Sequence, residues 1–204
     1  MRRSSFRRKT ALKVKHGRTA PKNRHVPTSH QGYVIDRESP GRGFRHVITK
    51  RDLQAFIDLI PDWGTWSHRL ERIILAAGNL DDDGCYAFYD REETGSITLH
   101  AWEEDLWVPL SADYFSEHQP ILEQLGVSWN AEGEDVVCRF TEAQAKAFVL
   151  LHVFLHELGH HAERLCQGLR DNTCGESYAE EFANRRFEMM FPDYVRVFGD
   201  PRLA

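Results

Sequence analysis

Residues 141–192 read TEAQAKAFVLLHVFLHELGHHAERLCQGLRDNTCGESYAEEFANRRFEMMFP and contain the most informative pattern of the chain. Thr141 and Gln144 match a capping box, in which a Thr N-cap is followed by a Gln at the third helical position. Residues 147–155 then place apolar side chains on nearly every side of a helix and carry no charge. A helix that is apolar all round is a buried one, so this pattern predicts a buried helix.

Within this helix, residues 156–160 read HELGH, an H-E-x-x-H motif. His156 and His160 are four residues apart, so their imidazoles lie one above the other on a single helical face and can bind one zinc ion. Glu157, between them, can then act as general base on the water that the metal activates. Gly159 is expected to leave room beside the metal.

Buried histidines also have a simpler interpretation, as core residues that hydrogen-bond to the backbone or to carboxylates. For His156 and His160 the metal is favoured, because two histidines and a glutamate in a capped, buried helix need partners for their polar groups. His152, one turn earlier on the same face, and His161, next to the second motif histidine, are interpreted as bystanders or as supporting groups.

A catalytic zinc site uses three protein ligands and one open position, so a third ligand is expected downstream. The sequence predicts a turn within residues 168–173 and a second helix over residues 175–190, which ends before Pro192. Glu176 and Glu180 are four residues apart and share a face of this helix. Glu176 is the predicted ligand, with Glu180 as the competing candidate. If Glu180 is not the ligand, it is expected to hydrogen-bond a ligand imidazole.

Both glutamates have alternatives without a metal. Thr173 and Glu176 would also fit a second capping box at the start of the helix. Glu180 and Glu181 could belong to a solvated helix face. These alternatives remain open at the level of the sequence.

HELGHH, followed by ExxAExFA and a proline, resembles the gluzincin metallopeptidases. It is most similar to the compact minigluzincins and to the ImmA/IrrE-type metallopeptidases. The resemblance covers about residues 153–192, and the family usually carries Asp or Asn at the position of Glu180. It implies three zinc ligands and one general base, namely His156, His160 and Glu176, and Glu157.

The remaining chain predicts an α+β fold, in which a small β-sheet packs on the motif helix as in a minimal zincin-like domain. The strand over residues 97–102 is expected to form the sheet edge to which an extended peptide could add. The expected elements are a helix over 49–60, a buried strand or short helix over 70–77, a hairpin of 85–89 and 97–102, a helix over 111–125 interrupted at Pro120, and a hairpin of 127–130 and 136–140.

Charge divides the chain in two. Residues 1–35 contain ten Lys and Arg and no Asp or Glu, although the whole chain has a net charge of -5. Residues 1–31 are therefore predicted to be a basic, disordered tail, followed by the zincin-like metallopeptidase domain over residues 32–204. The tail is interpreted as a solvated segment, and weak nucleic-acid contact is its main functional alternative.

The sequence contains neither the apolar core of a signal peptide nor a segment long enough to span a bilayer. Its four cysteines lack CxxC spacing and are predicted to be reduced thiols, with a disulfide between Cys166 and Cys174 as the less favoured alternative. The other two are Cys85 and Cys138. These features predict a cytoplasmic protein.

The sequence thus predicts an endopeptidase that uses one catalytic Zn2+ to hydrolyse the peptide bonds of a protein or peptide substrate. The alternative is a non-catalytic zinc-binding domain that holds a peptide for recognition or regulation, which the presence of Glu157 disfavours. A donor to the developing oxyanion is expected among Tyr178, His100, Tyr114 and Tyr194.

Overall fold

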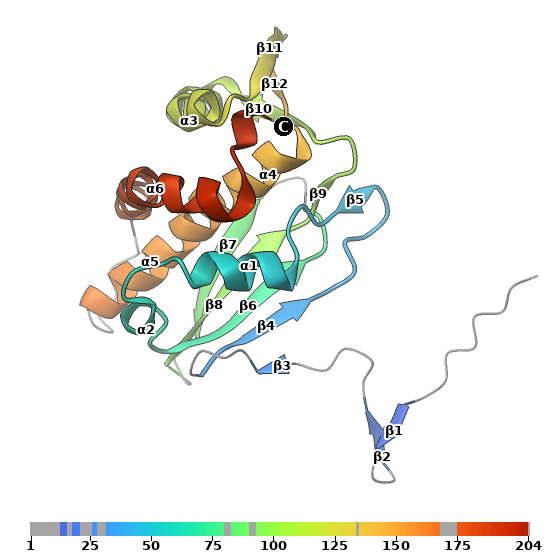
Figure 1. Cartoon of the computed structure of the whole chain (residues 1–204), viewed down its shortest axis with the longest axis vertical. Coiled ribbons are helices and arrows are strands. Elements are labelled where there is room, and N and C mark those ends of the chain that lie inside the picture. The colour runs from blue at the N-terminus through green and yellow to red at the C-terminus, as the bar shows by residue number, and fades with distance from the viewer. Residues whose placement is uncertain are drawn as a thin grey trace, which may run out of the picture.

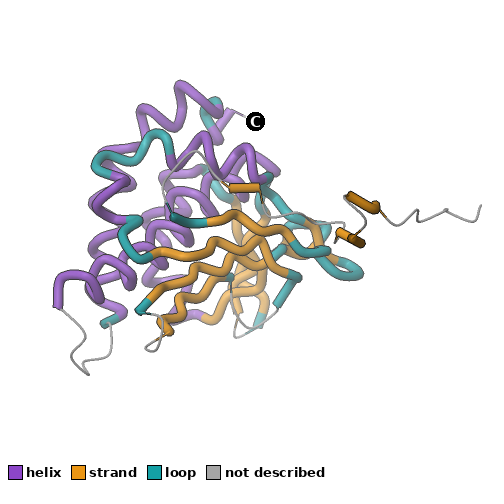
Figure 2. The backbone as a smooth tube through the Cα atoms, turned by 90° about the horizontal axis from the view of Figure 1, so that it is seen from below, coloured by secondary structure: helices purple, strands orange, loops and turns teal. Residues whose placement is uncertain are grey.

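The chain folds into helices and sheets of the predicted α+β class (Figure 1). The helices gather on one side of the main sheet (Figure 2). This is a computed structural model, and it describes residues 13–15, 18–20, 26–27, 32–79, 83–89, 93–133, 135–167 and 175–203.

The main sheet has five strands in the order β3-β4-β6-β8-β7. The central strands β4, β6 and β8 are parallel, and β7 returns antiparallel to β8. The strand bounds are β3 Val26–Pro27, β4 Val34–Arg37, β6 Leu70–Ala76, β8 Thr94–His100 and β7 Gly84–Tyr89. The ambiguous segment over 70–77 is therefore a strand, and the first predicted hairpin is confirmed as β7 and β8.

The predicted sheet edge over residues 97–102 is wrong. Strand β8 lies between β6 and β7, and the edges among the described strands are β7 and β3. Strand β8 pairs on both sides, and its Ile97 and Leu99 side chains are buried in the core. The hairpin makes β7 one neighbour of β8, as the local sequence predicts. The other neighbour, β6, precedes the hairpin in the chain and pairs in parallel, and no local sequence pattern predicts such a pairing.

A second sheet has the order β10-β12-β11, with β10 Trp107–Ser111, β12 Asp135–Arg139 and β11 Ser128–Glu132. The predicted second hairpin is confirmed as β11 and β12. Strand β10 was not expected, since Pro109 interrupts its pattern. Proline is tolerated there because β10 is an edge strand. Two short strands form a separate antiparallel pair: β5 Phe44–Arg45, which lies between β4 and β6 in the chain, and β9 Trp102–Glu103, which lies between β8 and β10.

The helices are α1 Lys50–Ile57, α2 Trp63–Trp66, α3 Ala112–Leu125, α4 Glu142–Phe148, η1 Val149–Val153, α5 Phe154–Gln167, α6 Glu176–Phe198 and η2 Pro201–Leu203. Segment η1 is a π-helical turn that joins α4 to α5, and η2 is a short 3-10 helix. The predicted helices over 49–60, 111–125 and 141 onward are confirmed.

Two predicted helix breaks are wrong, because α3 continues through Pro120 and α6 continues through Pro192. Each proline removes one backbone hydrogen bond. Burial of apolar neighbours holds the helices together at these points: Leu122 follows the first proline, and Met190 and Tyr194 flank the second. Tertiary packing thus overrides the local helix-breaking tendency.

Most of the predicted tail, and with it the prediction of disorder and nucleic-acid contact, lies outside the described residues. The described parts of it are the paired strands β1 Lys13–Lys15 and β2 Arg18–Ala20, and β3, which pairs with β4. None of the helices in the described residues combines the length and the apolar character that crossing a membrane requires. Cys85, Cys138 and Cys166 are present as thiols, and Cys174 lies outside the described residues.

Candidate metal centre

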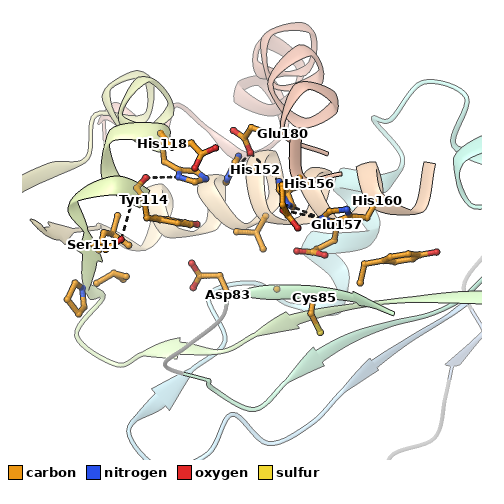
Figure 3. Close-up of a pocket in the computed structure, with 18 residues that line it drawn as sticks. Asp83, Cys85, Ser111, Tyr114, His118, His152, His156, Glu157, His160 and Glu180 are labelled. Atoms are coloured by element: carbon orange, nitrogen blue, oxygen red, sulfur yellow. Dashed lines mark hydrogen bonds and ion pairs between the residues drawn. The ribbon is translucent and has the colours of Figure 1, made fainter. Parts of the chain in front are cut away.

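The three predicted ligands meet at one end of a cleft (Figure 3). His156 and His160 project from α5, and Glu176 is the first residue of α6. The two Nε2 atoms are 3.2 Å apart, and the Glu176 Oε2 atom lies 3.1 Å from Nε2 of His156 and 3.5 Å from Nε2 of His160. The structure therefore brings these residues together in a group that could hold a metal ion.

Glu180 fixes the tautomer of the first histidine. Its Oε2 atom lies 3.2 Å from Nδ1 of His156. A carboxylate can only accept a hydrogen bond, so Nδ1 donates and Nε2 of the neutral ring keeps its lone pair. That lone pair faces the carboxylate of Glu176 and the ring of His160, so the centre is a convergence of electron-rich atoms that a cation would satisfy.

The electrostatics of this pair agree with the hydrogen bond. Burial lowers the pKa of His156, but the bond to Glu180 and the charges of Glu157, Glu180 and Glu176 outweigh it and raise the pKa overall. Burial would raise the pKa of Glu180, but the bond to His156 and the neighbouring His152 and His118 lower it to about 2. Glu180 is thus ionised, and it takes the supporting role that the sequence predicted for it if it is not the ligand.

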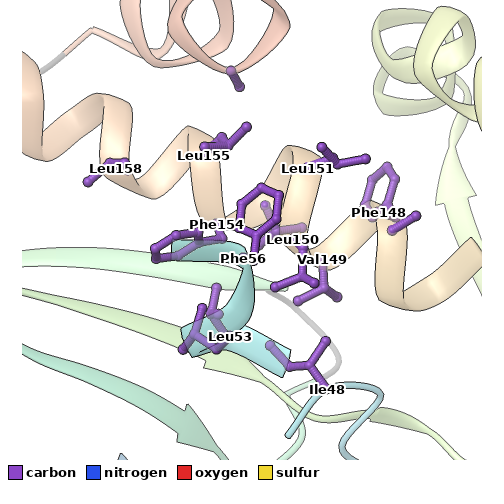
Figure 4. Close-up of a cluster of buried hydrophobic side chains, with 14 of the residues drawn as sticks. Ile48, Leu53, Phe56, Phe148, Val149, Leu150, Leu151, Phe154, Leu155 and Leu158 are labelled. Carbon is purple, nitrogen blue, oxygen red and sulfur yellow. The ribbon is translucent and has the colours of Figure 1, made fainter. Parts of the chain in front are cut away.

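The helix that carries the two histidines is anchored by the apolar core (Figure 4). Val149, Leu150 and Phe154 point toward α1 and the sheet, whereas Leu151 and Leu155 point to the opposite side, toward α6. All five side chains are buried. The prediction of a helix that is buried on every side is therefore confirmed, and it gives the site a rigid base.

The predicted capping box fixes where this helix begins. The Thr141 hydroxyl accepts from the Gln144 backbone N–H at 3.2 Å, and the Gln144 side chain accepts from the Thr141 N–H at 2.8 Å. The Gln144 amide also donates to the carbonyl oxygen of Gly126 at 2.8 Å, at the end of α3. The box thus connects the start of the motif helix to the end of α3.

Gly159 allows α6 to approach α5, rather than leaving room beside the metal as expected. A Cβ atom at this position would lie 2.8 Å from Cα and 3.0 Å from the carbonyl oxygen of Ala179. The buried Glu163 accepts from the backbone N–H of Gly175 at 2.7 Å, which ties the first turn of α6 to α5. Both contacts bring Glu176 and its helix to the motif histidines.

The alternatives for the α6 glutamates can now be compared with the structure. Gly175 is the N-cap of α6, so Glu176 is the first helical residue and cannot complete a capping box with Thr173. The side chain of Glu176 is 80% exposed and that of Glu180 is 16% exposed. Glu181 lies on a solvated face, where it pairs with Arg185, but Glu180 does not.

Glu157 lies on the same helix and lines the cleft. Its carboxylate points from α5 toward β7 (Figure 3). It packs against Gly84, where an added Cβ would lie 3.2 Å from Glu157 Oε1. The cleft has a volume of about 840 Å³, and its walls come from β7, β10, α3, η1, α5 and α6. Glu157 therefore stands beside the three candidate ligands, in a space that a substrate could enter.

His161 supports the edge strand. Its Nε2 lies 2.9 Å from the carbonyl oxygen of His68 and must donate to it, so its Nδ1 accepts from the Tyr86 hydroxyl at 3.0 Å. The ring of Tyr86 in turn stacks on that of His160, with centroids 6.4 Å apart. The interpretation of His161 as a supporting group fits these contacts.

We expect the free energy of unfolding to decrease as the pH is lowered, because His161 resists protonation in the folded protein. Burial lowers the pKa of His161 from 6.5 to about 4. As the pH falls below 6.5, the unfolded chain therefore binds a proton that the folded chain does not. This difference lowers the free energy of unfolding by roughly 2 kcal/mol at pH 5. Urea unfolding of metal-free protein at pH 7 and pH 5 measures this, and His161→Gln should flatten the dependence. An equally steep dependence in the variant would contradict the assignment.

The sequence did not predict that His118 and His152 line the same cleft. They form a second group with Glu180 that could hold a metal ion, so His152 is more than a bystander. The spacing of His152 ahead of the motif was a weak signal, but nothing in the sequence marked His118.

Of the four candidate oxyanion donors, Tyr114 lines the cleft. Tyr194 is buried in the core, and the His100 ring bonds the carbonyl oxygen of Ala77. Tyr178 is partly exposed at the start of α6. The structure thus retains Tyr114 from this set.

Comparisons of the chain with protein-family models, with curated proteins and with solved structures gave no match. The function must therefore be argued from the chemistry of the site.

Proposed function

We propose that this protein is a zinc-dependent peptidase of the gluzincin type, built on a minimal zincin-like domain. One observation carries the proposal: two imidazoles and a carboxylate converge within 3.1 to 3.5 Å in an open cleft, beside a second carboxyl group, that of Glu157. That is the residue set of a catalytic zinc site, with three protein ligands and a base that does not bind the metal.

The donor set fits zinc. Zinc binds histidine nitrogen and carboxylate oxygen at about 2.0–2.2 Å, so two ligands of a tetrahedral ion lie about 3.3–3.6 Å apart. The separations among His156, His160 and Glu176 are close to this range. A mixed nitrogen and oxygen set disfavours Ca2+ and Mg2+, which prefer oxygen ligands. When bound, zinc supplies Lewis-acid chemistry, which polarises a carbonyl group and makes a water molecule more acidic.

Glu157 performs the proton transfers in the proposed reaction. Its carboxylate accepts a proton from the water that attacks the peptide carbonyl carbon, and delivers that proton to the nitrogen as the C–N bond breaks. Glu180 holds the ring of His156 through Nδ1 and so orients the nitrogen that binds the metal. The products are a carboxylic acid and an amine.

The proposed substrate is an extended peptide that enters the cleft along β7. Strand β7 is one of the two edges of the main sheet among the described strands, and residues 83–86, at its start, line one wall of the cleft. Strand β10, an edge of the second sheet, lines another wall through residues 108–111. The edge strand of a sheet can bind a peptide backbone as an added strand, and the cleft would then place a peptide bond beside Glu157.

The metal content of the purified protein tests the proposed ligand set. We expect near-stoichiometric zinc in the wild type by elemental analysis, and a marked loss in Glu176→Ala, because this variant removes one of three ligands. The Glu176 side chain is 80% exposed, so its removal should leave the fold intact.

The matched control is Glu181→Ala, which removes an exposed carboxylate from the same helix and should retain the metal. Full zinc in Glu176→Ala would move the third ligand elsewhere. If the wild type contains no zinc even after supplementation, His156 and His160 are core histidines rather than metal ligands.

A further inference from the structure

A second set of candidate ligands lies deeper along the same cleft wall (Figure 3). It consists of His118 on α3, His152 on η1 and Glu180 on α6, whose ligand atoms all lie within 4.8 Å of one another. The two histidines are only 5% and 2% exposed. Three separate elements therefore bring polar side chains together where the core would otherwise favour apolar ones.

The orientation of His118 is fixed from outside the group. Its Nδ1 lies 2.7 Å from the backbone carbonyl oxygen of Tyr114, so Nδ1 donates and Nε2 of the neutral ring keeps its lone pair. The ring of Tyr114 also stacks on it, with centroids 3.9 Å apart. A backbone carbonyl that holds the far nitrogen of an imidazole is the usual support of a metal-binding histidine.

His152 is buried without hydrogen bonds from the described residues that would offset its burial. Its Nδ1 has no hydrogen-bond partner among them, and its Nε2 lies 4.0 Å from Glu180 Oε2, beyond hydrogen-bond distance. The residue sits in the π-helical turn η1, and such turns are frequent at functional sites. A cation held between His152 and Glu180 would give Nε2 the partner that Glu180 is too distant to provide.

Glu180 connects this group to the first centre. Its Oε2 atom contacts Nδ1 of His156, and its Oε1 accepts from the Asn184 amide at 3.1 Å. It is therefore held between a ligand of the first centre and the two histidines of the second group. Whatever binds beside Glu180 also acts on the group that orients His156.

We propose that His118, His152 and Glu180 form a second binding site for a transition-metal ion, coupled to the first through Glu180. Two imidazoles and one carboxylate suit zinc and similar borderline cations. The ligand atoms must close by roughly 1 Å to reach tetrahedral spacing, so this site binds more weakly than the first. The proposal stands whether or not the protein hydrolyses peptides.

Zinc titration tests this second site directly. Wild type is equilibrated with graded free zinc in a metal buffer, and bound zinc per chain is measured. We expect two equivalents in two affinity classes. His118→Phe keeps an aromatic ring against Tyr114 but removes the ligand, and should lose the weaker equivalent alone. Glu176→Gln should weaken the tighter one, and the double variant should lose the weaker equivalent and bind the other with reduced affinity.

The matched control is His100→Phe, since this histidine bonds a backbone carbonyl outside the cleft and should leave both equivalents unchanged. Saturation of wild type at one equivalent, or an unchanged second equivalent in His118→Phe, would overturn the proposal. Should His118→Phe fail to fold, the wild-type titration still decides between one and two equivalents. Loss of peptide hydrolysis would not alter these counts, so the two proposals fail separately.

Discussion

Glu157→Gln is expected to abolish peptide hydrolysis while the protein keeps its full zinc content. Glutamine matches glutamate in shape but cannot accept the proton of the attacking water, and general acid–base catalysis contributes about 10²–10⁴-fold to such rates. Glu157 is not one of the three converging ligands, so the metal should remain. Rates on an unstructured protein substrate, together with elemental analysis of the same samples, measure both effects.

The matched control for this substitution is Glu163→Gln. Both glutamates lie on α5 and are 6% and 7% exposed, but Glu163 accepts from the backbone N–H of Gly175, a role that a glutamine carbonyl can fill. Glu163→Gln should therefore retain hydrolysis. Wild-type rates in Glu157→Gln would refute the assigned base, and loss of zinc would make its role structural. A zinc-loaded wild type without hydrolytic activity would favour the alternative of a non-catalytic peptide-binding domain.

The convergence of the first centre could be predicted because it depends on two local spacings. His156 and His160 are four residues apart on α5, and Glu176 and Glu180 are four apart on α6. Residues at this spacing share a helical face. Once two such faces pack together, His156 meets one carboxylate at each of its ring nitrogens. The sequence contained both faces, and Gly159 allowed their close approach.

The rest of the cleft could not be predicted because it depends on pairings that are distant in the sequence. His118 reaches the cleft through the packing of α3 against α4, and its own helix gives no sign of a partner. The edge position of β7 depends on the parallel pairing of β6 with β8. The continuity of α6 through Pro192 depends on burial of Met190 and Tyr194 on either side. In each case a tertiary contact overrides or supplements the local pattern.

Gly159→Ala is expected to destabilise the protein by roughly 1–3 kcal/mol, the usual cost of overpacking a well-packed interior. The new Cβ would lie 2.8 Å from Cα of Ala179, a backbone atom that cannot move without the rest of α6. Displacement of α6 would carry Glu176 and Glu180 away from the histidines on α5, so zinc affinity should fall at least about 10-fold. Urea unfolding and competition with a chelator measure the two effects.

The effect of Gly159→Ala is separated from helix propensity by Gly64→Ala in α2, where a Cβ would meet no atom within 4 Å. Alanine reduces the freedom of the unfolded chain at either position, so the Gly64 variant should be as stable as wild type or slightly more stable. Equal stability and equal zinc affinity in both variants would mean that α6 adapts to the added methyl group. The carboxylates of α6 would then not depend on this close approach to reach the histidines.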